Sequence, residues 1–197
     1  MSPTAPPWDM ALYARAWAFA AEWHADQTSA SADPQRPLSY LHHLASVAAE
    51  VTWGLASTPG ADGNLAVQCA LLHDTLEDTP VSVELLTRHF GSGVASGVQA
   101  LSKNPSLPSR AAQMADSLRR ILQQPVEIAM VKLGDRIANL YQVPHDWDAA
   151  QAQAYAVEAQ GILQALGHAN PALAARLAQH IAAFGRRPLD AADSALG

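Results

Sequence analysis

Apolar side chains recur at intervals of three and four residues through most of this sequence. One stretch shows the pattern clearly, because Leu41, Leu44, Val47, Ala48 and Val51 fall on one face of a helix. Segments rich in proline and glycine interrupt the pattern, and alanine, a strong helix former, is abundant between them. Aromatic residues make up only 6% of the chain, which disfavours a β-rich sandwich. We therefore predict an all-α fold of close-packed helices.

Proline, glycine and helix-capping residues define the expected boundaries. Helices are expected at about residues 9–26, from 39 to before 59, and at 65–79, 82–91, 94–101, 110–124, 125–140, 149–166 and 171–184. A length of 197 residues suits one ordinary domain. We expect a disordered lead-in at 1–8, a single domain at 9–184 and a frayed C-terminal tail at 185–197.

The chain is acidic, with twelve basic and eighteen acidic residues and a formal net charge of −6. A non-specific nucleic-acid binder needs a basic face for its phosphate contacts, so we expect no nucleic-acid partner. An anionic small molecule would instead need a local positive site. A bound divalent cation can provide that site even in an acidic protein.

The only cysteine, Cys69, excludes an internal disulfide framework and a cysteine-rich zinc module. The segment from Met1 to Met10 lacks the basic and apolar parts of a signal peptide, and no apolar stretch is long enough to span a bilayer. We therefore expect a soluble, cytoplasmic protein without a membrane partner. The sequence carries no indication of its oligomeric state.

Four polar residues lie within one of the most apolar stretches of the chain, LLHDTLEDT at 71–79. At helical spacing His73 pairs with Glu77 and Asp74 with Asp78, so the four would share one side of a helix, with the His-Asp pair in its middle. Burying these groups without a counter-charge is costly, and a cation is the natural remedy. Imidazole and carboxylate ligands together favour Mn²⁺, Fe²⁺, Co²⁺ or Zn²⁺ over Ca²⁺.

Two adjacent ligands cannot surround a metal, because neighbouring side chains on a helix point about 100° apart. Further ligands must come from other helices. The best candidates are His43, near the start of the helix expected after residue 39, and Asp135, a lone acid in an otherwise apolar run.

Three motifs follow one another along the chain: YLHH at 40–43, ALLHDTLEDT at 70–79 and VKLGDRIANL at 131–140. In this order the chain resembles the HD superfamily of metal-dependent phosphohydrolases. Within it, the chain is most similar to small alarmone hydrolases and to the hydrolase domain of RelA/SpoT-type enzymes. The resemblance covers about residues 16–140, includes HFG at 89–91, and implies an HD-domain helical bundle.

The resemblance implies a role for each motif residue. The family's four metal ligands, usually bound to Mn²⁺, are matched by His43, His73, Asp74 and Asp135. Glu77 and Asp78 match an acidic pair that positions or deprotonates the attacking water, and Asn139 matches an asparagine of the substrate pocket. The implied reaction is hydrolysis of the 3′-diphosphate of a guanosine or adenosine alarmone, (p)ppGpp or (p)ppApp, with release of pyrophosphate.

One loop departs from the family. A basic Arg-Lys pair usually follows the His-x-x-Gln found here at 24–27, whereas this chain has TSASA at 28–32. Arg36 is therefore a candidate for the missing substrate contact, and the choice between guanine and adenine stays open. Two other functions also stay open: a nucleoside 5′-monophosphate phosphatase on the same fold, and a non-catalytic nucleotide sensor. The Glu77-Asp78 pair argues against the sensor, because binding alone needs no spare acid to handle water.

The remaining titratable residues have simpler interpretations. Cys69 is expected in the core, and His42 in the pocket wall or on the surface. Lys132 and Arg136 are expected to pair with nearby acids. The other histidines are expected to be solvated or to cap helices: His24, His89, His145, His168 and His180.

Overall fold

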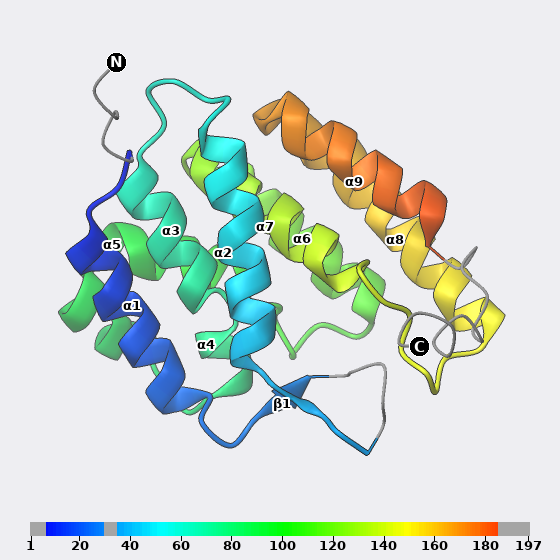
Figure 1. Cartoon of the computed structure of the whole chain (residues 1–197), viewed down its shortest axis with the longest axis horizontal. Coiled ribbons are helices and arrows are strands. Elements are labelled where there is room, and N and C mark those ends of the chain that lie inside the picture. The colour runs from blue at the N-terminus through cyan, green and yellow to red at the C-terminus, as the bar shows by residue number, and fades with distance from the viewer. Residues whose placement is uncertain (1–6, 30–34, 185–197) are drawn as a thin grey trace, which may run out of the picture.

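The computed structural model describes residues 7–29 and 35–184, and it confirms the all-α prediction (Figure 1). The expected lead-in at 1–8 and tail at 185–197 lie largely outside the described residues. The helices are α1 (Met10–Trp23), α2 (Leu41–Leu55), α3 (Gly63–Leu72), α4 (Thr75–Asp78), α5 (Val83–Leu101), α6 (Arg110–Ile121), α7 (Val126–Asn139), α8 (Ala149–Leu166) and α9 (Pro171–Ala183). Strands β1 (Thr28–Ser29) and β2 (Leu38–Ser39) pair antiparallel, and a 3-10 turn η1 (Gly167–Ala169) separates α8 from α9.

Short polar side chains begin most of the longer helices. Asp62, Ser82, Ser109, Asp148 and Asn170 each accept a hydrogen bond from a backbone N–H in the first turn of the helix that follows. Because these caps are visible in the sequence, the helix starts fall close to the expected positions.

The helix break expected at Gly91 is confirmed: it is a kink at which two helical segments of α5 meet. Gly91 has φ 84° and ψ 167° inside α5, a left-handed conformation that favours glycine. The two helices predicted at 82–91 and 94–101 are therefore the two halves of α5.

The prediction that His73 and Asp74 lie in the middle of a helix is wrong. Helix α3 ends at Leu72 and α4 begins at Thr75, so the pair forms the junction between them. The ring Nδ1 of His73 lies 2.9 Å from the carbonyl oxygen of Ala70. In a continuous helix that carbonyl would accept the N–H of Asp74. The imidazole of His73 takes over this acceptor, and the helix is interrupted at that point.

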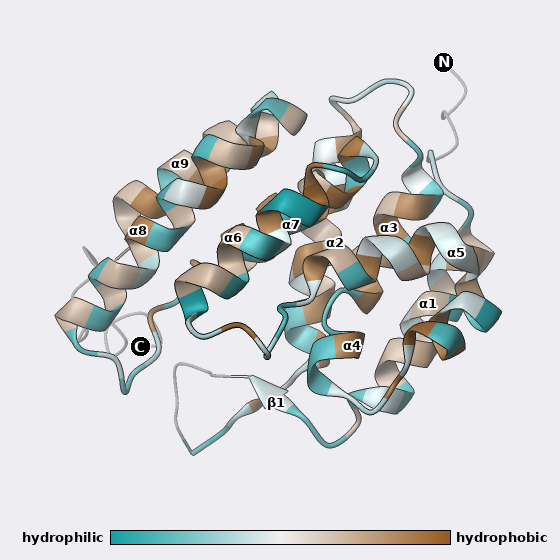
Figure 2. Ribbon diagram, turned by 180° about the vertical axis from the view of Figure 1, so that it is seen from behind, coloured by the Kyte–Doolittle hydropathy of each residue, from teal (hydrophilic) through white to brown (hydrophobic). Residues whose placement is uncertain are grey.

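Helix α7 is the central element of the bundle. It packs against α2, α3, α5, α8 and α9, and every residue from Glu127 to Ile137 is buried. Helices α1 and α5 lie on one side of it and α8 and α9 on the other (Figure 1). Figure 2 shows hydrophobic residues recurring along α2, α3 and α7, where these helices meet. The core therefore gathers around α7, which carries one of the predicted metal ligands.

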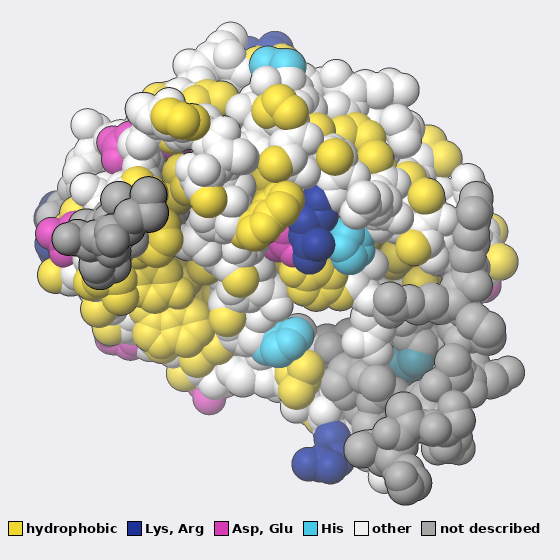
Figure 3. Space-filling model, turned by 45° about the horizontal axis from the view of Figure 1, so that its top comes forward, with side chains coloured by type: hydrophobic (Ala, Val, Ile, Leu, Met, Phe, Trp, Pro, Cys, Tyr) yellow, Lys and Arg dark blue, Asp and Glu magenta, His cyan; other side chains and the backbone are white. Residues whose placement is uncertain are grey.

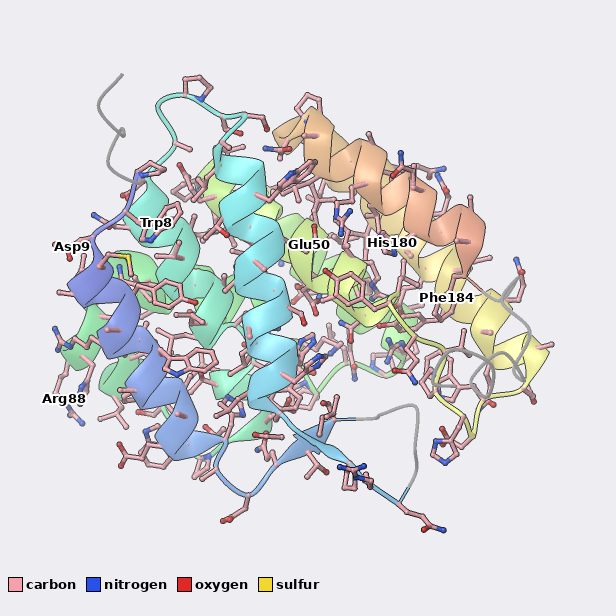
Figure 4. The ribbon with its side chains drawn as sticks, in the orientation of Figure 1. Trp8, Asp9, Glu50, Arg88, His180 and Phe184 are labelled. Atoms are coloured by element: carbon pink, nitrogen blue, oxygen red, sulfur yellow. The ribbon has the colours of Figure 1, made fainter. Side chains whose placement is uncertain are left out.

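A buried charge network joins the C-terminal helices to α2. Glu50, labelled in Figure 4, is 4% exposed, and both of its carboxylate oxygens accept bonds from Arg176 of α9, at 2.6 and 2.8 Å from Nε. The hydroxyl of Tyr141, just after α7, also donates to Glu50. Because a buried carboxylate is stable only when its charge is paired, this network fixes α9 against α2 and α7.

Figure 3 shows one face of the molecule, on which a few basic and acidic side chains lie among hydrophobic ones. No basic stripe crosses the described residues of that face. Among residues 7–29 and 35–184, no helix is both long and apolar enough to cross a membrane.

Two helix glycines give a matched test of the core packing. Gly97→Ala should lower the free energy of unfolding by about 1–2 kcal/mol, although alanine usually stabilises a helix by about 1 kcal/mol over glycine. The reason is that a Cβ at Gly97 would lie 2.5 Å from Ile128 Cδ1 and 2.9 Å from Cys69 Sγ. Gly161→Ala should stabilise, because a Cβ there meets nothing within 4 Å. Urea denaturation of both variants checks this, and equal gains would contradict it.

Candidate active site

Three helices bring predicted metal ligands to one buried point. His43 comes from the first turn of α2, His73 follows α3, and Asp135 comes from α7. One ligand atom of each lies within 4.8 Å of the others. The Nε2 atoms of His43 and His73 are 3.3 Å apart, and Asp135 Oδ1 lies 3.5 Å from the first and 3.7 Å from the second. These residues can hold a divalent metal ion.

Asp74, at the α3–α4 junction, lies beside this group and approaches both histidines. Its Oδ2 lies 2.9 Å from His73 Nε2 and 3.5 Å from His43 Nε2. Ligand atoms about 2.1 Å from a metal lie roughly 3 Å apart when they are neighbours around it. The spacing of His43, His73 and Asp135, the short distances from Asp74 to the two histidines, and the mixture of imidazole and carboxylate are therefore compatible with a transition-metal site.

The four candidate ligands are electrostatically coupled. Burial lowers the pKa of His73, but the charge of Asp74 and hydrogen bonds to Asp135 and Asp74 raise that pKa above its ordinary value. Burial raises the pKa of Asp74, but the charge of His73 and hydrogen bonds from both histidines hold it well below the usual range. Burial also raises the pKa of Asp135, but the charge of Lys132 and hydrogen bonds from both histidines hold it well below the usual range. Both carboxylates are therefore ionised near neutral pH, as ligands of a cation must be.

Neighbouring groups orient these side chains. Lys132 Nζ donates to Asp135 Oδ2 at 2.9 Å, and Asn139 Nδ2 donates to Asp135 Oδ1 at 2.5 Å. Hydrogen bonds of this kind fix ligand orientation in metal sites. Lys132 and Arg136 were expected to pair with nearby acids, and both do: Arg136 binds Glu158 at 2.6 Å.

Tyr40 is a functional candidate that the sequence did not reveal. Its hydroxyl donates to Asp74 Oδ2, and its ring lies between two histidines, 5.1 Å from His24 and 5.3 Å from His43. Burial and then the charge of Asp74 raise the pKa of Tyr40, so its hydroxyl stays protonated as a donor. The only signal in the sequence was an aromatic residue just before the histidine pair.

His24 is buried, although it was expected to be solvated or to cap a helix. It is the C-cap residue of α1, but its side chain is 0% exposed and its Nδ1 lies 2.7 Å from Gln27 Oε1. Gln27 Nε2 in turn donates to the carbonyl of Asp78 at 2.7 Å. The His-x-x-Gln segment therefore supports both Tyr40 and the end of α4.

Tyr40→Phe should weaken metal binding by about tenfold to a hundredfold while leaving the fold intact. The change removes only the hydroxyl that orients Asp74, and loss of such an outer partner typically costs this much affinity. Isothermal titration calorimetry with Mn²⁺ measures the change in metal affinity. Tyr13→Phe, on α1, is the matched control. Equal affinities in the Tyr40 variant and the control would rule out this role.

The predicted acidic pair lies beside the cluster rather than in it. Lys103 holds both carboxylate oxygens of Glu77: its backbone N–H donates to Oε2 at 2.9 Å and its ammonium donates to Oε1. Among the described residues, the Asp78 carboxylate has no ion pair. Burial, and then the charges of Asp74 and Glu77, raise the pKa of Asp78 above its ordinary value. The two acids are thus in different environments.

The remaining predicted positions lie farther out. Asn139 places its amide on Asp135, and Arg36 is exposed in the segment that leads into β2. His42 is exposed, whereas His43 beside it faces the cluster. Cys69 is fully buried, as expected, with its Sγ 3.8 Å from the carbonyl of Val94.

The all-α bundle and a His/Asp cluster that could hold a divalent metal define the class of fold and site, and comparison with known proteins gives the family. The HD domain model matches residues 16–172. The MESH1 guanosine-3′,5′-bis(diphosphate) 3′-pyrophosphohydrolase of Danio rerio is 32% identical over 166 residues, which are 82% of this chain and 87% of that protein. The MESH1 protein of Xenopus tropicalis is 30% identical over 173 residues, 86% of this chain and 92% of that protein.

Longer proteins and a solved structure also resemble this chain. The GTP pyrophosphokinase rsh of Brucella ovis is 33% identical over 143 residues, but these are only 17% of that longer protein. A structure described as a metazoan ortholog of SpoT that hydrolyzes ppGpp has a TM-score of 0.74 at 23% identity, covering 92% of this chain and 97% of its own, and it supports the fold. This chain belongs to the HD domain family. The resemblance seen in the three sequence motifs is confirmed.

Proposed function

We propose that this protein is a metal-dependent hydrolase that removes the 3′-diphosphate of alarmone nucleotides such as ppGpp and releases pyrophosphate. The observation that carries the proposal is the convergence of His43, His73 and Asp135 on one point of an HD fold, with Asp74 beside the two histidines. The MESH1 relatives, whose name states this activity, match over most of their length and of this chain.

The proposed reaction is balanced by water alone. A water oxygen attacks the phosphorus that is attached to the 3′ oxygen of the nucleotide, and the bond between this phosphorus and the 3′ oxygen breaks. The 3′ oxygen takes up a proton and becomes a free hydroxyl, and the two phosphates leave as pyrophosphate. A divalent metal held by the four ligands would lower the pKa of that water and offset the charge of the diphosphate. We propose Mn²⁺ as this metal, because a mixed imidazole and carboxylate donor set suits it.

The chain's own residues would manage the proton and the substrate. Asp78, with a raised pKa and no ion pair among the described residues, is suited to take a proton from the attacking water. Glu77, on the same short helix, would position that water or the acid beside it. Asn139 lies one turn after Asp135 and Arg36 lies in the hairpin segment; we propose both as substrate contacts.

We propose that the base preference depends on the residues at 24–39. This segment has no basic residue at 28–32, where the resembling enzymes carry an Arg-Lys pair. Because the contact from this basic pair to the nucleotide is missing, we propose that adenosine alarmones such as ppApp are accepted besides ppGpp. We propose a cytoplasmic location, because a reducing compartment suits a chain with one buried cysteine. Residues 9–184 are proposed to act as one functional domain.

A panel of nucleotides tests the proposal. Purified protein with Mn²⁺ would be incubated with ppGpp, ppApp and the nucleoside 5′-monophosphates, and products resolved by ion-exchange chromatography. Pyrophosphate and a nucleotide with a free 3′-hydroxyl are expected from the first two, and chelation by EDTA should stop the reaction. Inorganic phosphate from the monophosphates would instead identify a 5′-phosphatase. Binding of ppGpp with no turnover would identify a sensor.

A further inference from the structure

Lys103 reaches the acidic pair from a different part of the chain. Ser102 ends α5 with an extended backbone, φ −71° and ψ 137°, so the chain turns out of the helix at this residue. The next backbone N–H, that of Lys103, then donates to Glu77 Oε2 at 2.9 Å, and the ammonium of the same residue donates to Oε1. One residue therefore grips both oxygens of Glu77.

Helix α6 anchors the point from which Lys103 reaches. The guanidinium of Arg120 donates to the carbonyls of Gln99 and Ser102, the latter at 2.7 Å, and its Nε binds Asp116 Oδ2 at 2.8 Å. The last carbonyls of a helix have no partner within the helix. Arg120 supplies hydrogen-bond donors for these carbonyls, so the end of α5 is bound to α6 immediately before Lys103.

The acidic pair needs such an anchor because its helix is short. Helix α4 has four residues, too few to be stable by its own hydrogen bonds. The first half of α4 is held by packing, because Thr75 is buried and Leu76 lies against the core. The second half carries the acidic pair, and among the described residues two polar contacts attach it: Gln27 donates to the carbonyl of Asp78, and Lys103 binds Glu77. An exposed ion pair adds little stability to a fold, so the two-point grip on Glu77 matters chiefly for geometry.

We propose that Lys103 is a positioning residue of the active site, which acts through Glu77 to hold α4 so that the Asp78 carboxylate faces the attacking water. Arg120 and Asp116 act one step further out by holding Lys103. This inference rests on the proposed function and assigns different roles to the two acids. Glu77 attaches α4 to Lys103, and Asp78 is the acid that exchanges the proton with the attacking water.

The first test compares Lys103→Met with Lys103→Arg. The methionine variant keeps the apolar stem but loses the ammonium; its kcat should fall by at least about tenfold, with KM and Mn²⁺ affinity within about twofold of the parent protein. The arginine variant should recover most of the loss. Arg88→Met removes one positive charge from the outer side of α5 (Figure 4) and should leave kcat unchanged. Loss of Mn²⁺ affinity, or an unchanged kcat in Lys103→Met, would overturn the proposal.

The pH profile gives a readout that a purely structural role would not change. The groups acting on the pKa of Asp78 are Asp74 and Glu77, which raise it with burial, and His24 and Lys103, which lower it. Removal of the Lys103 ammonium should therefore move the acidic limb of kcat/KM to higher pH. An acidic limb at the parental pH in Lys103→Met would count against the proposal.

A double-mutant cycle separates positioning from direct contact with substrate. If Lys103 acts through Glu77, then Lys103→Met should cause no further loss of kcat in a Glu77→Gln background. Fully additive losses would mean that Lys103 acts on the substrate itself, and would overturn the inference.

Hydrogen exchange keeps this test apart from the proposed function. Lys103→Met should raise deuterium uptake in the peptide that contains residues 75–79, and Arg88→Met should not. Unchanged deuterium uptake in Lys103→Met would refute the proposal that Lys103 holds α4 in place. Parent protein that hydrolyses none of the nucleotides would refute the proposed function, and the exchange result would still decide the role of Lys103.

Discussion

Asp135→Ala should abolish metal binding and reduce turnover at least about a thousandfold. Asp135 is the contribution of α7 to the cluster, and its Oδ1 lies 3.5 Å from His43 Nε2 and 3.7 Å from His73 Nε2. Without it, the remaining ligands come from α2 and the α3–α4 junction alone. The site would then be open on the side of α7, and the buried histidines would lose a carboxylate partner.

Thermal unfolding with and without Mn²⁺ measures this effect independently of activity. Metal at a hundred times its Kd should stabilise the parent protein by about 2.7 kcal/mol, and this gain should vanish in the variant. Asp135→Asn is a needed companion, because its amide oxygen can still accept the bond from buried Lys132. Glu84→Gln, an exposed acid at the start of α5, is the control. Stabilisation of Asp135→Ala by Mn²⁺ as large as that of the parent protein would refute the assignment of Asp135 as a ligand.

Asp78→Asn should leave metal binding intact but lower kcat by about 10² to 10⁴-fold, the usual contribution of a positioned acid or base. The carboxylate lies outside the cluster and is free of ion pairs among the described residues, so its loss removes a proton acceptor rather than a ligand. Glu77→Gln should cost less, because Lys103 already occupies both of its oxygens.

The pH dependence of the parent enzyme follows from the same residue. Activity requires ionised Asp78, whose pKa is raised by burial and by Asp74 and Glu77, so activity should fall as pH drops through a value above that of an ordinary aspartate. Profiles of kcat/KM for the parent and for Asp78→Glu check this. A larger loss in Glu77→Gln than in Asp78→Asn would reverse the two roles.

Much of the fold could be predicted because its signals are local. Helix starts follow from caps such as Ser109 and Asn170, and buried faces follow from apolar spacing. The family could be predicted because its motifs are short and contiguous, and the comparisons confirm it. The break at Gly91 could be predicted for the same reason, because its positive φ favours glycine and interrupts the helix locally.

The active site could be predicted only in part. His43, His73 and Asp135 are conspicuous because polar residues in apolar helices need a reason, and the structure places them together. The break between α3 and α4 was missed, because it depends on a bond from the His73 ring to the carbonyl of Ala70. The difference between Glu77 and Asp78 was also missed, because Lys103 lies 26 residues away in the chain.

The sequence alone therefore determined the all-α architecture, the family and the chemical character of the cluster, because these depend on residue type and on spacing along one helix. Only the tertiary structure decided how the groups divide their work. Tyr40 with Asp74 and Lys103 with Glu77 are contacts between segments that no local pattern links. They depend on how α2, α4 and the end of α5 are arranged around α7, and that arrangement is set by packing of the whole core.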